Sequence, residues 1–448
     1  MKLGGWAAAA LLGATVGAAE APPVHLILIT LDTLRADHLG AYGYGLPTSP
    51  AIDGLARSST LFEDVTCSIP STLPSHLTIL TGLTPAQHGV TENGFVPDRD
   101  LTSIFELVER RGVRTAAVVS AGVVGERYLA SLGIDEFFFG DGGPRKARQV
   151  PGSAVTDRAV AWLADHGGEP FALWLHYFDA HEPYTPPPAF ASRFTRGYQG
   201  PLGDALDTPW LVGLNGEAGA ALSARDRRHV ADLYDAEIAF LDAQLDRLFA
   251  FLKARRLWHK TLILLTADHG QAHGENGFWG HGERLLEPVI KVPLIVKLPG
   301  QESSGTVNGS VQTLDIVPTL AEYFGLDAPP ESGGRSLLPA LRGAELEPAP
   351  LRLVERRTYS RTAPGRRGLA LHGGTWKLVF YREEDGTSYH LGRIDGEGGL
   401  DGENFYTPGS PEDRLLRQVV ARRQEPPAAV QDLPAETVEM LRALGYIQ

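Results

Sequence analysis

Short apolar runs rich in β-branched residues alternate with helix-type patterns through the first three quarters of the chain. The longest helix-type pattern runs from Ser223 to about Arg255 and places apolar residues at three- and four-residue steps. This alternation predicts an α/β fold with a large, mostly parallel sheet flanked by helices. The predicted strands are Val24–Leu31, Arg114–Ser120, Phe171–Tyr177, Thr261–Thr266 and Val292–Lys297, and the other predicted helices are Leu101–Arg111, Val155–His166 and Val311–Phe324.

The composition changes after residue 298, where turn-forming residues become frequent. The stretch from Ala328 to Gly334 is rich in Pro and Gly and is typical of a linker. Later short apolar runs predict a small antiparallel sheet followed by a terminal helix. The runs are Leu351–Thr358, Gly368–Leu371 and Trp376–Tyr381, and the helix is Ala435–Leu444. We therefore expect a large domain over residues 24–325 and a small C-terminal α+β subdomain over 326–448.

The first nineteen residues have the pattern of an export signal. Lys2 supplies a positive charge, residues 6–16 form an apolar, Ala-rich run, and small residues precede position 20. We expect a signal peptide over 1–19 and export to the periplasm or outside the cell; an Ala-rich tail is the alternative. No other run approaches about 18 apolar residues, so no membrane span is expected.

Charge and cysteine content narrow the classes of partner. The chain has 448 residues and a net charge of −13, with no basic stripe, so a nucleic-acid partner is not expected. Cys67 is the only cysteine and cannot form a disulfide within the chain. The sequence specifies no oligomeric state.

Thr72 stands where a helix is predicted to begin. Pro74 suits a first helical turn, and Gly82 suits the end of the same helix. The Thr72 hydroxyl would then lie at the positive end of the helix dipole, where a developing anion is stabilised. A divalent metal ion could complete its activation as a nucleophile. The alternative is that Thr72 only caps the helix.

Carboxylates follow two of the predicted strands. Asp32 ends the first strand, and the pair Asp268 and His269 ends the strand that begins at Thr261. Because ligands of open α/β sheets bind at the carboxyl ends of the strands, we expect these side chains to meet near Thr72. Oxygen ligands with one imidazole suit Zn, Mn or Mg, and the predicted metal ligands are Asp32, Asp268, His269 and Thr72.

Three further residues are candidates for contact with an anionic substrate. His181 follows the strand Phe171–Tyr177 and could protonate a leaving group, although a structural histidine is the alternative. His281 lies between two glycines, which let the backbone approach a ligand closely. Lys291 is a weaker substrate-binding candidate, with a structural charge as its alternative.

These stretches together resemble the sulfatase family of the alkaline phosphatase superfamily. The matching segments cover roughly residues 24–325 in the family's order. They are Leu28-Ile-Thr-Leu-Asp-Thr-Leu-Arg-Ala-Asp-His-Leu-Gly, Thr48-Ser-Pro-Ala-Ile-Asp-Gly, Thr72-Leu-Pro-Ser-His with Leu80-Thr-Gly, Gln87-His-Gly-Val, His176-Tyr-Phe-Asp-Ala-His-Glu-Pro-Tyr, Thr266-Ala-Asp-His-Gly and Asp315-Ile-Val-Pro-Thr. The resemblance implies an alkaline-phosphatase-like fold and a hydrolase of sulfate or phosphate esters that holds one or two divalent ions, Ca included.

The chain also departs from the sulfatase pattern. Thr72 occupies the position of the Cys or Ser that becomes formylglycine, so formylglycine is not expected, and His76 occupies the position of the motif's Arg. Thr33 replaces the second Asp of the first metal strand. A Thr nucleophile is similar to that of the superfamily's phosphodiesterases and phosphoethanolamine transferases. An alternative register would make Ser68, or Cys67, the nucleophile.

From these residues we predict an ester hydrolase that forms a covalent intermediate on Thr72. His76, His181 and His281 would neutralise substrate oxygens or protonate the leaving oxygen, which predicts stronger anion capture at mildly acidic pH. The substrate class is a sulfated or phosphorylated small molecule or glycan. One alternative is a phosphodiesterase, phosphonate monoester hydrolase or phosphoethanolamine-type transferase, and a second is an inactive protein that binds anionic glycans.

Overall fold

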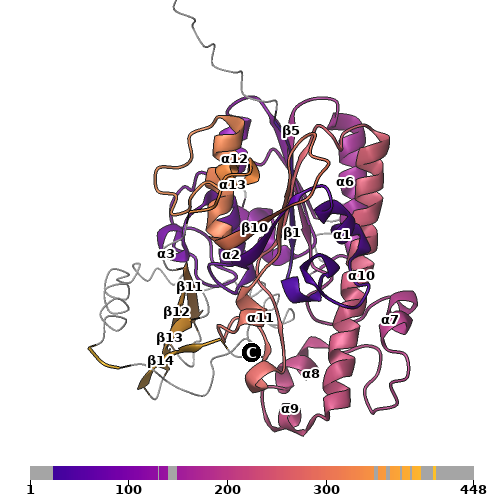
Figure 1. Cartoon of the computed structure of the whole chain (residues 1–448), viewed down its shortest axis with the longest axis vertical. Helices are drawn as coiled ribbons and strands as arrows, with labels where there is room; N and C mark the ends of the chain where they lie inside the picture. The colour runs from indigo at the N-terminus through magenta and orange to yellow at the C-terminus, as the bar shows by residue number, and fades with distance from the viewer. Residues whose placement is uncertain are drawn as a thin grey trace, which may run out of the picture.

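The computed structural model describes residues 24–129, 131–139, 149–347, 352–359, 364–373, 376–383, 386–394 and 407–409. A large sheet, with helices on both faces, forms the centre of the molecule (Figure 1). The predicted signal peptide at 1–19 and the predicted terminal helix at 435–444 lie outside the described residues. Among the described helices, none combines the length and the apolar character needed to cross a membrane.

The large sheet has eight strands in the order β10-β2-β9-β6-β1-β5-β3-β4. The strands are β1 (His25–Leu31), β2 (Thr60–Thr66), β3 (Arg114–Val119), β4 (Glu136–Phe139), β5 (Phe171–Tyr177), β6 (Leu262–Ala267), β9 (Leu294–Lys297) and β10 (Gly305–Gln312). Only β9 runs antiparallel to its neighbours in this sheet; the other pairs are parallel. The predicted mostly parallel sheet is therefore confirmed.

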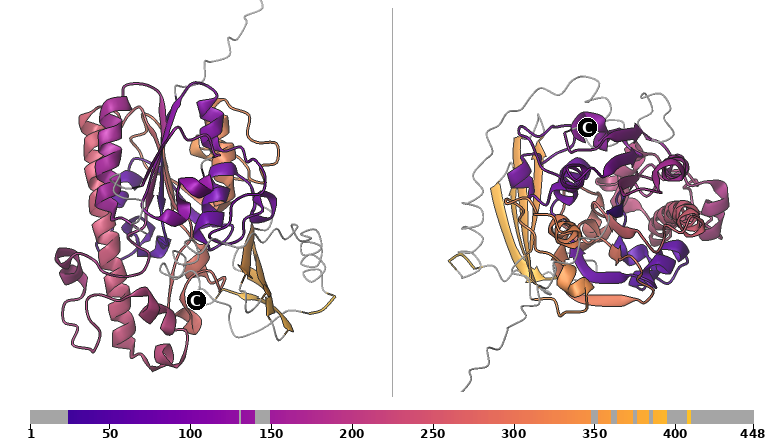
Figure 2. Two further views of the ribbon diagram at one scale, coloured as in Figure 1. Left: turned by 180° about the vertical axis from the view of Figure 1, so that it is seen from behind. Right: turned by 90° about the horizontal axis from the view of Figure 1, so that it is seen from above.

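Helices cover both faces of this sheet (Figures 1 and 2). One face carries α1 (Pro50–Ala56), α6 (Gly152–His166) and α10 (Ala224–Ala254), and the other carries α2 (Thr72–Thr81), α4 (Ile104–Glu109), α12 (Ile316–Phe324) and α13 (Leu338–Leu341). The remaining short elements are α3 (Pro85–His88), α5 (Glu126–Leu129), α7 (Pro188–Phe194), α8 (Thr208–Gly213), α9 (Glu217–Ala221), α11 (Glu287–Ile290), the hairpin of β7 (Ala272–His273) and β8 (Trp279–Gly280), and five 3₁₀ turns (Ala36–His38, Gly40–Tyr42, Gly122–Val124, Glu275–Gly277 and Thr313–Asp315). The predicted long helix begins at a capping box, in which Ser223 and Asp226 bond reciprocally.

A second, antiparallel sheet follows the linker, as predicted. It contains β11 (Arg352–Tyr359), β12 (Pro364–Gly373), β13 (Trp376–Glu383) and β14 (Gly386–Arg393) in that order. Its buried Lys377 forms an ion pair of 3.0 Å with Glu287 of α11, and the backbone N–H of Glu355 donates to the Ser68 carbonyl. The small sheet therefore contacts the segment that leads into α2.

One predicted element is wrong in its first part. The pattern from Val311 predicts a helix, but β10 extends to Gln312 and the helix begins only at Ile316. Residues 305–312 pair in parallel with β2 at the edge of the sheet. Pro318 lies in the first turn of α12, where its missing N–H costs no helical hydrogen bond.

Gly82 ends α2, as the sequence predicts, and offers a test of this end of the helix. Its φ of 71° is left-handed, and an added Cβ would lie 2.7 Å from Ser332 Oγ and 3.1 Å from Val317 Cβ. Gly112 has a similar φ of 75° but nothing within 4 Å. We expect Gly82→Ala to lower the free energy of unfolding by about 1 kcal/mol more than Gly112→Ala. Equal losses in denaturant titrations would show that the contacts at Gly82 are unimportant.

Candidate active site

The register of three central strands brings the predicted metal ligands to one edge of the sheet. Leu31 of β1 pairs with Ala267 of β6 on one side and with Tyr177 of β5 on the other. Asp32 directly follows β1, and Asp268 directly follows β6. The backbone N–H of Asp32 also donates to the Tyr177 carbonyl at 2.9 Å. The structure therefore brings together side chains that are far apart in the sequence.

Asp32, Asp268 and His269 form a compact, buried cluster. One ligand atom from each of the three lies within 4.8 Å of the other two, and none of the side chains is exposed. Asp32 Oδ1 and Asp268 Oδ2 accept no hydrogen bond from any described residue. Buried carboxylate oxygens without partners are costly, and a cation would remove that cost. Two carboxylates and an imidazole therefore fit a divalent cation.

Neighbouring backbone groups hold these ligands in position. Asp268 Oδ1 accepts the N–H groups of Thr33 at 3.1 Å and of His269 at 2.8 Å. The second oxygen, Asp268 Oδ2, then remains available to bind a cation together with Asp32 and His269. His269 Nδ1 lies 3.0 Å from the Gly270 carbonyl, a contact that selects the tautomer with Nε2 as the ligand atom.

Thr72 is the first residue of α2, and its side chain reaches the same cluster. Its Oγ1 lies 3.4 Å from His269 Nε2 and also donates a hydrogen bond to the Asp32 carboxylate. The N-cap of the helix is Ser71, so a capping role does not account for Thr72. Asn93 Oδ1 accepts the Leu73 N–H at 2.8 Å and fixes the beginning of the helix. The Thr72 hydroxyl therefore lies beside Asp32 and His269, as the sequence predicts.

The alternative nucleophiles lie before the helix. Cys67 follows β2, its N–H donates to the Ile290 carbonyl, and burial raises the pKa of its thiol above its usual range. Ser68 contacts the small sheet through its carbonyl. Since neither begins α2, we keep Thr72 as the candidate.

Electrostatic repulsion acts inside the cluster when no cation is bound. The pKa of Asp32 is raised well above its usual range by burial and by repulsion from Asp268 and Glu182. Burial also raises the pKa of Asp268 to about 6. A carboxyl whose folded pKa is raised holds a proton that the unfolded chain has already released, so folding becomes less favourable as pH rises through this window.

This sign gives a pH prediction for the metal-free protein. Between pH 4 and pH 6, we expect the Asp268 carboxyl to lower the free energy of unfolding by on the order of 2 kcal/mol as pH rises. The measurement is thermal unfolding in chelator across this range, for the wild type and for Asp268→Asn. The wild type should lose more stability than the variant, and parallel curves would contradict the prediction.

His76 lies next to the cluster but uses both ring nitrogens within the protein. Nδ1 lies 2.7 Å from the Thr72 carbonyl and Nε2 lies 3.0 Å from Thr30 Oγ1, and the ring is fully buried. The prediction that His76 contacts the substrate therefore does not fit this geometry. Its contacts suit a role in positioning the first turn of α2.

Lys291 is directed elsewhere. Its ammonium group lies 3.5 Å from Asp64 and 3.8 Å from Glu287, and 42% of its side chain is exposed. These ion pairs support the structural alternative for Lys291, so we do not carry it forward as a substrate ligand.

His181 and His281 meet beside the Asp32 cluster. Their Nε2 atoms lie 3.1 Å apart, and the His281 ring lies 4.5 Å, centroid to centroid, from the His269 ring. Burial lowers the pKa of His281 well below its usual range and that of His269 to about 3. Both shifts favour the neutral rings, and a neutral His281 opposes the predicted gain in anion capture at mildly acidic pH.

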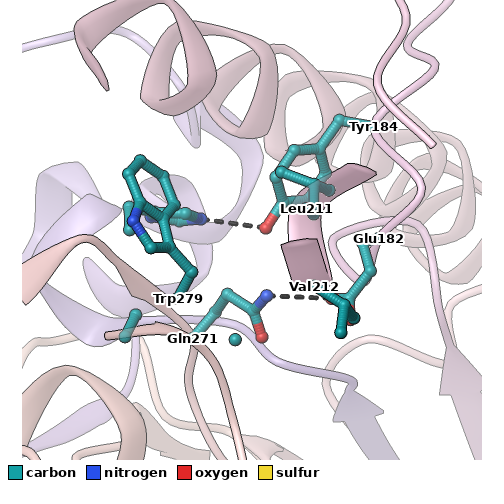
Figure 3. A pocket seen from close by; sticks show the side chains of 9 residues that line it. Glu182, Tyr184, Leu211, Val212, Gln271 and Trp279 are labelled. Atoms are coloured by element: carbon teal, nitrogen blue, oxygen red, sulfur yellow. Dashed lines mark hydrogen bonds between the residues drawn. The ribbon is translucent and has the colours of Figure 1, made fainter. Parts of the chain in front are cut away.

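Three buried residues beside Asp32 and His181 have no role predicted from the sequence. His176 Nε2 lies 3.3 Å from Asp32 Oδ2, and Gln271 Nε2 donates to Glu182 Oε2 at 2.8 Å (Figure 3). His176 lies on β5 one residue before the end of the strand. This position near the strand end could have indicated that its side chain lies close to Asp32. Glu182 directly follows His181, but nothing in its spacing distinguishes it from a loop acid.

Thr33, which replaces an Asp of the sulfatase pattern, has an unusual backbone. Its φ of 54° is rare for a β-branched residue, and such conformations cluster at functional sites. Its N–H contacts Asp268 at 3.1 Å, and its carbonyl accepts the Tyr234 hydroxyl at 2.8 Å. Its own hydroxyl donates to the Asp32 carbonyl at 2.8 Å. Thr33 therefore supports a ligand through its backbone.

Comparison with known proteins shows the family to which this chain belongs. A model described as Sulfatase matches residues 25–326, well over half of the 448 residues. A second model, described as the C-terminal part of N-sulphoglucosamine sulphohydrolase, matches residues 274–390. The chain belongs to the sulfatase family. As a member of this family it is an ester hydrolase. The predicted membership of the sulfatase family and the predicted hydrolysis of ester bonds are therefore both confirmed.

Individual relatives of this sulfatase-family chain span several activities. It is 29% identical to the multifunctional alkaline phosphatase superfamily protein PehA of Trinickia caryophylli, over 42% of this chain and 40% of PehA's length. It is 26% identical to a sulfatase of Formosa agariphila, over 82% of this chain and 80% of that protein. The chain thus spans less than half of PehA.

Solved structures confirm the fold. One protein, in complex with its substrate D-glucosamine-2-N,6-O-disulfate, matches with a TM-score of 0.74 and 18% identity, covering 90% of this chain and 98% of that one. The phosphonate monoester hydrolase of Agrobacterium radiobacter matches with a TM-score of 0.70 and 19% identity, covering 90% and 94%. At these identities the likeness concerns the fold alone.

Proposed function

We propose that this sulfatase-family hydrolase depends on a divalent cation and uses Thr72 as its nucleophile. The observation that carries the proposal is the place of Thr72 Oγ1, 3.4 Å from His269 Nε2 and hydrogen-bonded to Asp32. A cation of Ca, Mn, Mg or Zn, held by Asp32, Asp268, His269 and Thr72, would lower the pKa of the Thr72 hydroxyl and stabilise charge on the transferred group.

Each of these side chains has a separate role in the proposed reaction. Thr72 Oγ1 bonds to the sulfur or phosphorus of the ester while the bond to the alcohol oxygen breaks. The helix dipole of α2 stabilises negative charge at Thr72. His181 and His281, which lie beside His269, would donate hydrogen bonds to the anionic oxygens or a proton to the departing alcohol oxygen. Water then cleaves the Thr72 ester and releases sulfate or phosphate.

A substrate panel with trapping of the intermediate tests this proposal. An aryl sulfate, a phosphate diester and a phosphonate monoester would each be mixed with cation-loaded protein and quenched within one turnover. We expect at least one of them to leave a sulfuryl or phosphoryl group on the peptide that contains Thr72, as seen by mass spectrometry. Turnover with no modified peptide, or with modification at another residue, would refute the nucleophile.

The second candidate is phosphorus chemistry on the same scaffold. One observation favours it: Thr72 stands where sulfatases have Cys or Ser, and a Thr nucleophile is similar to that of the superfamily's phosphodiesterases. In the panel, preference for the phosphonate or the diester over the sulfate would establish this candidate. Transfer to an added alcohol instead of water would identify a phosphoethanolamine-type transferase. Ligand binding without turnover would instead identify an anion-binding protein.

The natural substrate that we propose is a sulfated or phosphorylated glycan or small molecule. The hollow that Leu211, Val212 and Trp279 line next to Glu182 has room for little more than one water molecule, so the uncharged part of the substrate must lie elsewhere (Figure 3). We also propose export to the periplasm or outside the cell. N-terminal sequencing of the protein recovered from its native compartment tests this, with a beginning at position 20 as the expected result.

A further inference from the structure

The peptide group that follows Thr72 is held by side chains at both of its polar atoms. Its carbonyl oxygen lies 2.7 Å from His76 Nδ1, and its N–H, which belongs to Leu73, donates to Asn93 Oδ1 at 2.8 Å. All four residues are buried. Because a peptide group is planar, holding it at both atoms fixes the ψ angle of Thr72 and with it the direction of the Thr72 side chain.

His76 is also linked to the centre of the large sheet. Its Nε2 lies 3.0 Å from Thr30 Oγ1, and Trp174 Nε1 donates to the same oxygen at 2.9 Å. Thr30 lies on β1 and Trp174 on β5, and both are fully buried. A chain of three hydrogen bonds therefore connects two central strands with the carbonyl of Thr72.

The chemistry of the donors gives this chain one direction. The indole of Trp174 can only donate, so it occupies one lone pair of Thr30 Oγ1. In the described part of the chain, the partners found for Thr30 Oγ1 are this indole and His76 Nε2, so the Thr30 hydroxyl donates to Nε2. An imidazole that accepts at Nε2 has its proton on Nδ1 and donates it to the Thr72 carbonyl. Asp268 Oδ2 lies 3.7 Å from Nδ1, too far to compete as an acceptor.

The beginning of α2 needs such support because the usual caps are missing. The first N–H groups of any helix have no partner within it, and Pro74 has no N–H at all. The N-cap residue, Ser71, makes no side-chain hydrogen bond with the helix. The orientation of Thr72 therefore depends on Asn93 and His76, which take the place of a cap.

We propose that His76 is a positioning residue, whose Nδ1–H holds the Thr72 carbonyl and thereby aims the Thr72 hydroxyl at the ester. This role rests on the proposed function and deepens it, because it assigns the alignment of the nucleophile to a histidine that Thr30 and Trp174 keep in one tautomer. Thr72 Oγ1 must approach sulfur or phosphorus opposite the departing oxygen. A displacement of about 1 Å can lower such a rate about 100-fold.

Two amide substitutions distinguish the two ring nitrogens of His76. An Asn side chain can place an amide N–H close to the position of Nδ1, whereas a Gln side chain reaches toward the position of Nε2. We expect His76→Asn to keep kcat within about fivefold of the wild type and His76→Gln to lose about 100-fold, with KM changed less than about threefold in both. Equal losses in the two variants, or wild-type kcat in His76→Gln, would overturn the role.

Thr30→Val tests the same chain while leaving His76 in place. Val has nearly the shape of Thr but no hydroxyl, so the imidazole proton is no longer confined to Nδ1, and kcat should fall about tenfold. Thr81→Val is the matched control, because Thr81 is fully buried in the last turn of α2 and its hydroxyl also donates to a carbonyl, that of Leu77 at 2.6 Å. The control should lose similar stability in denaturant titrations and keep kcat. A Thr30→Val enzyme as active as this control would contradict the relay.

Nitrogen NMR tests the tautomer without using activity. The full chain would be labelled with ¹⁵N-histidine and loaded with Mg²⁺, and the signals that disappear in His76→Asn identify His76. We expect a ring protonated at Nδ1 in the wild type and a shift of the proton toward Nε2 in Thr30→Val. A wild-type ring protonated at Nε2 would overturn the inference.

These measurements separate the role of His76 from the role of Thr72. A trapped Thr72 ester together with an Nε2–H tautomer, or with full kcat in His76→Gln, would leave the nucleophile standing and remove His76 as its positioning residue. Trapping of the ester on another residue would refute the proposed function and the role of His76 with it, whatever the tautomer. The Nδ1–H tautomer, the loss of kcat in His76→Gln and its recovery in His76→Asn together would establish both.

Discussion

Replacing Thr72 with Ala should reduce kcat/KM by about 10⁴-fold or more, because the variant lacks the hydroxyl that forms the covalent ester. Thr72→Ser should keep measurable activity, since it retains an oxygen at the same place. Both variants should keep their bound cation, because Asp32, Asp268 and His269 remain. The measurement is steady-state kinetics on the best substrate of the panel, with metal content determined on the same samples.

Ser71→Ala is the matched control for this experiment. Ser71 is the N-cap of α2, and its side chain makes no capping hydrogen bond with the helix. Its removal should change kcat/KM by less than about threefold, since a cap without that bond contributes little. If Thr72→Ala retained activity within tenfold of the wild type, the nucleophile would have to be another group.

The second large effect is expected for Asp268→Asn. Activity should fall on the order of 10³-fold, because the variant loses a charged ligand at the place where charge develops. Stability should move the other way in the metal-free protein above pH 6. Asn removes the repulsion between Asp268 and Asp32, so the melting temperature in chelator should equal or exceed that of the wild type.

Adding a divalent cation should reverse this order of stability. The wild type gains stability from the bound ion by mass action, whereas the variant gains much less. Asp165→Asn, at an exposed position on α6, serves as the control and should follow the wild type in both conditions. A variant that melts lower than the wild type in chelator would show that Asp268 is needed for packing and not for binding a cation.

Much of this site could be predicted from the sequence because strand ends converge by rule. The apolar runs that became β1, β5 and β6 are long and uninterrupted, so the residues that follow them had to meet at one edge of a parallel sheet. The positions of Pro74 and Gly82 likewise predicted α2 almost to its ends. Local signals were therefore enough to place Asp32, Asp268 and Thr72.

Other elements depend on pairing between distant segments and could not be predicted locally. β2 contains Glu63 and Asp64 in its middle, which breaks the apolar pattern of a buried strand. It is held by β10 and β9, more than 200 residues later in the sequence. β10 itself is an edge strand with mostly partly exposed residues, so its pattern carries little hydrophobic signal.

The roles of individual side chains were harder to predict than the backbone. His76 occupies the position of an Arg in the family motif, but its ring turns into the protein and bonds to Thr72 and Thr30. Glu182 and Gln271 bond to each other although 89 residues separate them. Such pairs depend on side-chain direction in the folded protein, which spacing along a chain does not encode.

The contact between Thr33 and Asp268, which lie 235 residues apart, has a consequence for the order of events in the cell. Asp32 and Thr72 are synthesised long before Asp268 and His269. A nascent chain that ends before Asp268 lacks two of the four predicted metal ligands. A cation held by all four residues can therefore bind only after residue 269 has left the ribosome and β6 has joined the sheet beside β1.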